Sequence, residues 1–383
     1  MIPADHALRS SLALKLWSIE RKSHVMSLVA DQGLALFAGL NAIPKRSYLS
    51  EYSHRIDHSK TTRLLGKWQQ AVSQSDLIDG SSFNLDFHSA PYFGEHPVVE
   101  THYVAMRSRG QPSALVFLAQ DAAGHSFCYS NADIRQGEER DEILSFVKFW
   151  KRTRGEVPKH LVFDSQLTNY ANIAKLDRMN ITFITLRRRN PTLMKEIVNL
   201  PTSAWRTIHL DVPTRKFQNP RVVEQRIALA GCKLRQLFIQ DLGHEEATIL
   251  ITNDLTSSCA KLITKYAQRM LIENALSDAV RFFHINALSS AVGLKVDFDM
   301  ALMVIASGLY RLLAKRMRGY GDAQARLIFR DLIQIPAKVD ITNSGVNVQF
   351  HRRSHLPIIM ASGLLEKPVS VPWWGGKTLT MTA

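Results

Sequence analysis

Cysteine is scarce in this chain of 383 residues, which contains only Cys128, Cys232 and Cys259. Their number is odd and they lie far apart in the sequence, without C-x-x-C spacing. A disulfide framework and a zinc knuckle are therefore not expected. Buried free thiols in a cytoplasmic protein are the interpretation that fits this pattern.

Long apolar runs are also missing. No stretch of about 18 apolar residues occurs, so a membrane-spanning helix is not expected. Residues 1–9 carry no basic region that leads into an apolar stretch, and a secretory signal peptide is therefore not predicted. The chain also has no internal repeat and no low-complexity tract.

Acidic residues are few relative to basic ones. The chain has 34 Asp and Glu against 48 Lys and Arg, which gives a formal net charge of +14 and a pI near 9.8. Such a balance favours a polyanionic partner. Nucleic acid is the first candidate, and an anionic membrane surface is the second. The length predicts two or three domains.

Residues 1–78 are predicted to be helical, with helices over 7–19 and 23–40. Basic and histidine side chains are frequent in the second half of this region: Lys45, Arg46, His54, Arg55, His58, Lys60, Arg63 and Lys67. They are expected either to dock on the DNA backbone or to form a solvated helical face, and the residues alone leave both interpretations open.

The pattern then changes to that of a mixed α/β sheet. Alternating or short apolar runs predict strands at 82–88, 114–119, 126–130, 160–164 and 181–186. Helical spacing predicts helices at 141–150 and 168–179. The order of three strands, helix, strand, helix and strand predicts an antiparallel meander followed by parallel crossovers.

Four further strands, at 206–212, 222–229, 235–240 and 248–252, predict a β-rich insert. Helices are expected at 257–283 and 297–316, and a hairpin at 339–350. The predicted organisation is a helical N-terminal region, a core in two parts, the insert between them and a C-terminal segment. Their ranges are 1–78, 79–200 with 256–316, 201–255 and 317–383.

Three acidic residues stand out by their positions in these elements. Asp86 lies inside a strand, where aspartate is disfavoured. Asp164 follows the apolar strand 160–163, at a strand end of the kind where open α/β sheets place ligands. Glu273 lies in a largely apolar helix, where an unpaired carboxylate is costly unless a cation binds it.

Together these acids suit phosphodiester chemistry. Three carboxylates can hold two Mg²⁺ ions roughly 3.5–4 Å apart, with Mn²⁺ as a substitute, and such a pair activates the nucleophile and stabilises the leaving oxygen. Each acid taken singly also fits a helix cap, a turn or a salt bridge. Another acid, Asp121, is expected to be a hairpin-turn residue with Gly124.

Three segments carry a resemblance to a known family: SFNLDFHSAPY at 82–92, HLVFDSQLT at 160–168 and YAQRMLIEN at 266–274. The chain resembles the DDE transposases of bacterial insertion sequences, and the third segment fits their Tyr-x2-Arg-x3-Glu signature. The resemblance implies a ribonuclease H-like core and a catalytic, metal-binding triad of Asp86, Asp164 and Glu273.

The resemblance also implies a partner and a reaction. The partner is double-stranded DNA at terminal inverted repeats, and a homodimer holds the paired ends in a synaptic complex. The reaction is cleavage and strand transfer by a hairpin-forming, cut-and-paste route at the bacterial nucleoid. Related members often carry a longer N-terminal region, so the resemblance leaves a truncated start open.

Six basic or aromatic residues are candidates for DNA contact. Tyr266, Arg269 and Glu273 are spaced by 3 and 4 residues and would share one face of a helix. Arg269 and Tyr266 are then expected beside the metals, although an ordinary i,i+4 Arg–Glu pair is the alternative. The signature continues with a basic residue where Val280 stands, and the next residue, Arg281, is its expected substitute.

The other three candidates are Arg187, Arg188 and Arg189, which follow the strand at 181–186 and either line a DNA channel or form a solvated strand end. Two rival functions share this sequence pattern. One is a nuclease of the same fold without strand transfer, and the other is an inactive, transposase-derived DNA-binding protein. The presence of all three acids disfavours the second.

Overall fold

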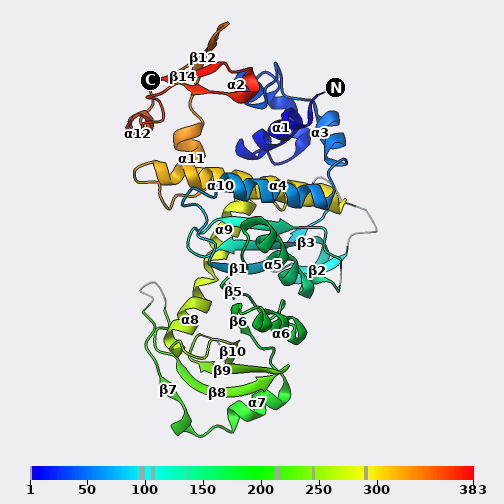
Figure 1. The fold of residues 1–383 in the computed structure, drawn as a ribbon, viewed down its shortest axis with the longest axis vertical. Helices are drawn as coiled ribbons and strands as arrows, with labels where there is room; N and C mark the ends of the chain where they lie inside the picture. The colour runs from blue at the N-terminus through cyan, green and yellow to red at the C-terminus, as the bar shows by residue number, and fades with distance from the viewer. Residues whose placement is uncertain are drawn as a thin grey trace. The chain divides into compact units, whose positions relative to one another are not determined.

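The computed structural model describes residues 2–94, 100–104, 108–135, 137–211, 216–243, 246–288 and 292–383 (Figure 1). The chain forms two compact units. The first unit comprises Met1–Thr61, Ser89–Ala114 and Leu276–Ala383, and the second comprises Thr62–His88 and Leu115–Ala275. The two units do not test the division of the sequence into five segments, which remains a prediction.

A large mixed sheet dominates the second unit, so the expected α/β class is confirmed. Its strand order is β4-β3-β1-β5-β6-β10-β9-β8-β7, and β2 pairs with the first residues of β3. Pairing is parallel for β1 with β5 and for β5 with β6. The strands are β1 Ser82–Pro91, β2 Thr101–Val104, β3 Arg109–Asp121, β4 Phe127–Asn131, β5 His160–Val162, β6 Thr182–Leu186, β7 Arg206–Thr207, β8 Arg221–Leu229, β9 Cys232–Gln240 and β10 Thr248–Thr252.

The strands of the predicted β-rich insert extend this sheet. Strand β10 pairs antiparallel with β6, and β9, β8 and β7 follow as an antiparallel meander. Helix α7 (Pro191–Val198), which the sequence pattern did not predict, precedes them. It begins with Pro191 in the first turn, and the Asn190 side chain caps it by accepting from the Leu193 amide at 2.8 Å.

Apolar side chains at helical spacing fix α5 (Glu142–Arg154) against the sheet. The ring centroid of Phe83 on β1 lies 5.1 Å from that of Phe146 and 4.6 Å from that of Trp150. All three side chains are buried. The helix ends at Gly155, which adopts the left-handed conformation that glycine tolerates best. Helix α6 (Tyr170–Arg178) follows β5.

Asp121 is a turn residue, as predicted, and its buried carboxylate joins two turns. Its Oδ2 accepts a hydrogen bond from the Gly124 amide at 2.6 Å, and its Oδ1 accepts one from the Gly80 amide at 2.8 Å. A side chain on Gly124 would collide with the Leu77 carbonyl oxygen. The turn therefore requires both Asp121 and a glycine at 124.

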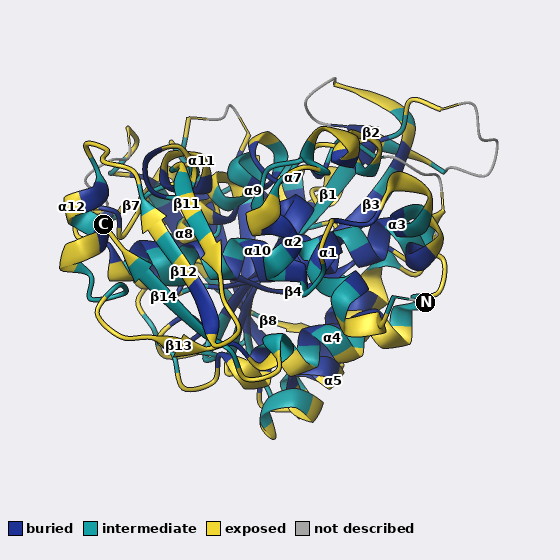
Figure 2. Ribbon diagram, turned by 90° about the horizontal axis from the view of Figure 1, so that it is seen from above, coloured by how far each residue is buried: buried dark blue, intermediate teal, exposed yellow. Residues whose placement is uncertain are grey.

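The first unit is mainly helical. Its central helix is α10 (Gly293–Arg316), most of which is buried (Figure 2). Its other helices include α1 Ala4–Leu16, η1 Lys22–Leu28, α2 Gln32–Ala38, α3 Arg46–Ser53, α11 Ala325–Ile328, η5 Phe329–Ile333, α12 Leu356–Ala361 and η6 Pro372–Trp374. Helix α4 (His58–Ala71) contains one boundary between the units. Among the described residues, no helix is both long and apolar enough to cross a membrane.

Two details of this unit bear on the sequence predictions. The single helix expected over 23–40 is wrong: η1 and α2 are separate, and α2 begins where Asp31 caps it by accepting from the Leu34 amide at 2.8 Å. The predicted hairpin is confirmed as β11 and β12. It belongs to a four-stranded sheet of β11 Ala337–Ile341, β12 Gly345–Phe350, β13 Val369–Ser370 and β14 Thr378–Thr382.

Candidate active site

Pairing between β1 and β5 brings together the two segments that carry Asp86 and Asp164. Asn84 on β1 is registered with Val162 on β5 in a parallel pair. Two residues beyond this pair come Asp86, inside β1, and Asp164, just after the last residue of β5. Both acids therefore lie near the carboxyl end of β5, the kind of position where open α/β sheets place ligands.

Asp86 is largely buried, with only 16% of its side chain exposed. Burial raises the pKa of this carboxyl to about 6, and the charges of Asp164 and Glu273 act in the same direction, while Arg269 opposes them. The charges of Asp164 and Glu273 thus reach Asp86. A carboxylate with a raised pKa among like charges is typical of catalytic and cation-binding sites.

Hydroxyl groups fix the backbone at Asp164. Its carbonyl oxygen accepts hydrogen bonds from the side chains of Thr168 at 3.2 Å and Thr185 at 3.1 Å. Its carboxylate Oδ1 accepts from the Gln166 amide at 2.9 Å, which forms a tight turn after β5. The two threonines were not identified from the sequence, although Thr168 closes the segment HLVFDSQLT.

The helix predicted at 257–283 is wrong as one continuous element. It forms α8 (Cys259–Gln268) and α9 (Leu271–Arg281), separated at Arg269 and Met270. The junction is tightened by i,i+3 hydrogen bonds, among them Arg269 amide to Tyr266 carbonyl at 3.1 Å and Glu273 amide to Met270 carbonyl at 3.0 Å. Glu273 lies in the first turn of α9 with its side chain exposed.

Arg269 pairs with Asp86 and not with Glu273, so the alternative of an i,i+4 Arg–Glu pair is wrong. Its Nη1 lies 3.2 Å from Asp86 Oδ1, and its side chain is 12% exposed. Its guanidinium carbon lies 5.8 Å from the ring centre of Tyr266. Burial would lower the pKa of Arg269, but Asp86 and Tyr266 outweigh that effect and raise it. The guanidinium therefore stays charged.

The guanidinium of Arg269 retains donors for a further partner. Its buried Nε and Nη1 have no hydrogen-bond acceptor among the described residues, because the approach to Asp86 is an ion pair without hydrogen-bond alignment. Buried donors without acceptors are costly. An anionic oxygen, such as that of a phosphate, would satisfy them.

The side chains at the site are of the kind that binds a divalent cation. Carboxylate oxygens are the ligands that Mg²⁺ and Mn²⁺ prefer. Among the described residues, no three His, Cys, Asp or Glu side chains lie close enough together to hold one ion as they stand.

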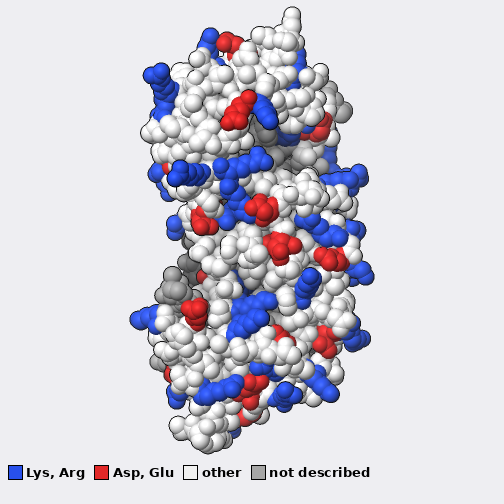
Figure 3. Space-filling view, turned by 60° about the vertical axis from the view of Figure 1, so that its left-hand side comes forward, with Lys and Arg blue, Asp and Glu red and all other residues white. Residues whose placement is uncertain are grey.

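The three successive arginines lie beside Asp164. A hollow of about 560 Å³ is lined by Asp164, Ser165, Gln166, Leu186, Arg187, Arg188, Arg189, Thr248 and Ile249. Arg187 donates to the Gln236 side chain at 2.5 Å, and Arg189 pairs with Glu246 at 2.6 Å. Lys and Arg side chains gather in groups on the face drawn in Figure 3, with acidic residues between them. The hollow therefore combines an acid of the predicted triad with cationic groups that suit phosphates.

The last of the predicted DNA contacts, Arg281, is the final residue of α9. Its side chain is exposed, and the residue belongs to the first unit. Its predicted substitution for the basic residue expected at Val280 remains a prediction.

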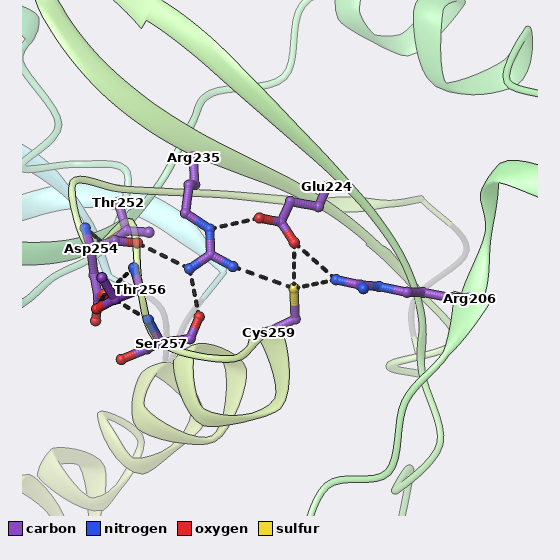
Figure 4. A network of polar contacts seen from close by, with 8 residues as sticks. All are labelled: Arg206, Glu224, Arg235, Thr252, Asp254, Thr256, Ser257 and Cys259. Atoms are coloured by element: carbon purple, nitrogen blue, oxygen red, sulfur yellow. Dashed lines mark hydrogen bonds and ion pairs between the residues drawn. The ribbon is translucent and has the colours of Figure 1, made fainter.

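A buried polar network supports the start of α8 (Figure 4). Arg235 is almost fully buried and donates to Glu224 at 2.8 Å and to the carbonyl oxygens of Asp254 and Ser257. The Cys259 thiol donates to Glu224 at 3.2 Å. The network joins β8, β9 and the first residue of α8, the helix whose end presents Tyr266 and Arg269.

Replacing Arg235 by Ala is expected to lower the free energy of unfolding by about 3–5 kcal/mol, the range for removing one partner of a buried ion pair. Arg206, 58% exposed, pairs with the same Glu224 at 2.9 Å and provides the matched control. Its replacement by Ala should cost only about 0–1 kcal/mol. Urea unfolding of both variants measures the difference, and equal losses would contradict the role of burial.

Comparison with known proteins gives a distant structural similarity and no match by sequence. No protein family matches the chain by sequence, and no curated protein matches it. Among solved structures, the chain is similar to a piggyBac transposase from a synaptic complex with hairpin DNA, with 11% sequence identity and a TM-score of 0.41. The similarity covers 79% of this chain and 66% of the other, just under two thirds of its length.

Proposed function

We propose that this protein is a DDE-type transposase that cleaves and joins DNA with Asp86, Asp164 and Glu273. The observation that carries the proposal is the position of Asp86 on β1 and of Asp164 just after its parallel neighbour β5, with the charge of Glu273 reaching Asp86. Burial and the charges of Asp164 and Glu273 raise the pKa of Asp86, and this supports a single site for bound positive charge.

The strand order supports a ribonuclease H-like core for this site. Asp86 lies on the first core strand, and Asp164 follows the fourth, counting β1, β3, β4 and β5. Glu273 comes after the insert, on the later helix α9. This is the order of acids and elements that the resemblance to DDE transposases implies, and each acid comes from a different element of the fold.

In the proposed reaction, this chain positions a DNA phosphodiester against the acids. Two bound Mg²⁺ ions would activate the attacking oxygen and neutralise charge on the leaving oxygen. Asp86 and Asp164 would hold them, together with Glu273. The free donors of Arg269 would bind a non-bridging oxygen of the scissile phosphate, and Arg187 to Arg189 would contact neighbouring phosphates. These contacts orient the strand for in-line attack.

Incubation of the purified protein with DNA from both flanks of its own reading frame, in Mg²⁺, tests the proposal. We expect strand cleavage near the repeat ends, followed by joining of the new 3′-hydroxyls to a second DNA or by hairpin formation. Hydrolysis without joining would identify a nuclease of the same fold. Binding without cleavage would identify an inactive derivative, and the absence of both would contradict the proposal. Chemical crosslinking on paired ends tests the proposed homodimer.

The net charge of +14 predicts a strong salt dependence of DNA binding. Binding is expected to weaken with a log–log slope of about −0.9 for each phosphate contacted, because bound counterions are released. Replacing the exposed Arg188 by Ala should reduce the slope by about 1. A flat salt response in a fluorescence-anisotropy titration would show that the basic residues serve another partner.

A further inference from the structure

A second hollow lies next to the one that contains Asp164. It has a volume of about 370 Å³ and is lined by Arg140, Thr168, Asn169, Tyr170, Ala171 and Arg188. Arg188 lines both hollows. The two hollows are therefore neighbours that share one cationic side chain.

The side chains around the second hollow offer two kinds of contact. Arg140 and Arg188 are exposed, and neither guanidinium forms an ion pair with any of the described residues. The Arg188 Nε donates a hydrogen bond to the Ser165 carbonyl oxygen at 3.3 Å. Tyr170 is 40% exposed, a large apolar surface for an aromatic residue at a charged site. Free cationic donors beside an open aromatic ring suit a phosphate linked to a flat ring.

We infer that this hollow binds one unpaired nucleotide of the DNA strand next to the scissile phosphate. Arg140 and Arg188 hold the nucleotide's phosphate, and its base stacks on Tyr170. The inference rests on the proposed function, which places the scissile phosphate at Asp164. The nucleotide must be unpaired because a base within a duplex does not present its face to a protein ring. The volume lies within the range of pockets that hold small molecules.

Binding of two DNA probes in EDTA tests this inference. One probe is a blunt duplex, and the other is the same duplex with a short unpaired extension. We expect the wild-type protein to prefer the extended probe, and Tyr170→Ala and Arg140→Ala each to reduce that preference by about tenfold, within the range for loss of one stacked base. Tyr170→Phe should retain the preference, because the ring remains.

Arg178→Ala is the matched control. Arg178 is exposed at the last residue of α6, eight residues after Tyr170, or about 12 Å along the helix axis. Its replacement removes one positive charge, as Arg140→Ala does, from the helix that begins with Tyr170, and the preference for the extended probe should stay unchanged. Because Arg140 and Tyr170 are accessible at the surface, melting temperatures of all variants should remain at the wild-type value.

The outcomes separate this inference from the proposed function, because binding in EDTA requires no cleavage. A preference lost in Tyr170→Ala but kept in Arg178→Ala supports the site even if the protein never cuts DNA. Equal preference in the wild type and in the Tyr170→Ala and Arg140→Ala variants overturns the inference even if cleavage depends on Asp164. Competition by an acidic peptide as strong as that by the oligonucleotide would also overturn it.

Discussion

Replacing Asp164 by Asn is expected to reduce metal-dependent DNA cleavage by at least about 10²–10³-fold, the range for losing one preorganised group that stabilises transition-state charge. The change keeps the shape of the side chain and its acceptor oxygen, so the turn in which Asp164 accepts from the Gln166 amide should persist. What is lost is one negative charge next to Asp86. DNA binding should therefore change little. A gel-shift assay measures DNA binding and a cleavage assay measures the reaction, and only cleavage should be lost.

The same loss is expected for Asp86→Asn and Glu273→Gln. Asp241→Asn serves as the control, because Asp241 is a partly exposed acid of the second unit that pairs with Arg221. It should cleave at the wild-type rate. Wild-type cleavage by any variant of the three acids would remove that acid from the triad.

Replacing Arg269 by Ala is expected to lower cleavage by at least about tenfold, equivalent to about 1.4 kcal/mol of transition-state stabilisation. The reason is the loss of the buried donors that lack an acceptor in this structure. The ion pair with Asp86 is largely buried, so the free energy of unfolding should also fall, by about 1–3 kcal/mol. If Arg269 instead formed an exposed ion pair with Glu273, Arg269→Ala would be expected to change the free energy of unfolding very little.

Arg269→Lys distinguishes the two effects. It keeps the charge beside Asp86 and should recover most of the stability, but a single ammonium lacks the planar fork that binds two phosphate oxygens. Cleavage should remain impaired. Should Arg269→Ala lose stability and still cleave at the wild-type rate, Arg269 is only a structural partner of Asp86.

Much of the second unit could be predicted from periodicity. The strands around Asp86 and Asp164 were predicted because alternation and short apolar runs are local properties of the chain. Their relative register was not, since a shift of the pairing by two residues keeps the same side chains on the same faces of the sheet. The pairing of Asn84 with Val162 shows which parts of the two segments lie side by side. The ribonuclease H-like core and the metal ions remain predictions.

The prediction of one continuous helix at 257–283 failed because contacts with distant residues override the local spacing. Tyr266, Arg269 and Glu273 fit one helical face, but the chain turns at Arg269, and this turn accompanies its ion pair with Asp86, a residue 183 positions earlier (269 − 86). The alternation in the insert likewise gave no indication that its strands would extend the main sheet from β6. The network around Arg235 joins β8, β9 and the start of α8, and no local pattern marks it.

Metal rescue of an Asp164→Cys variant tests the central claim most directly. A thiolate is a poor ligand for Mg²⁺, and softer ions accept it better. Cleavage by this variant should therefore be lost in Mg²⁺ and partly restored in Mn²⁺, while Asp164→Asn stays inactive in both and the wild type cleaves in both. Cleavage by Asp164→Cys at the wild-type rate in Mg²⁺ would contradict the assignment of Asp164 as a metal ligand.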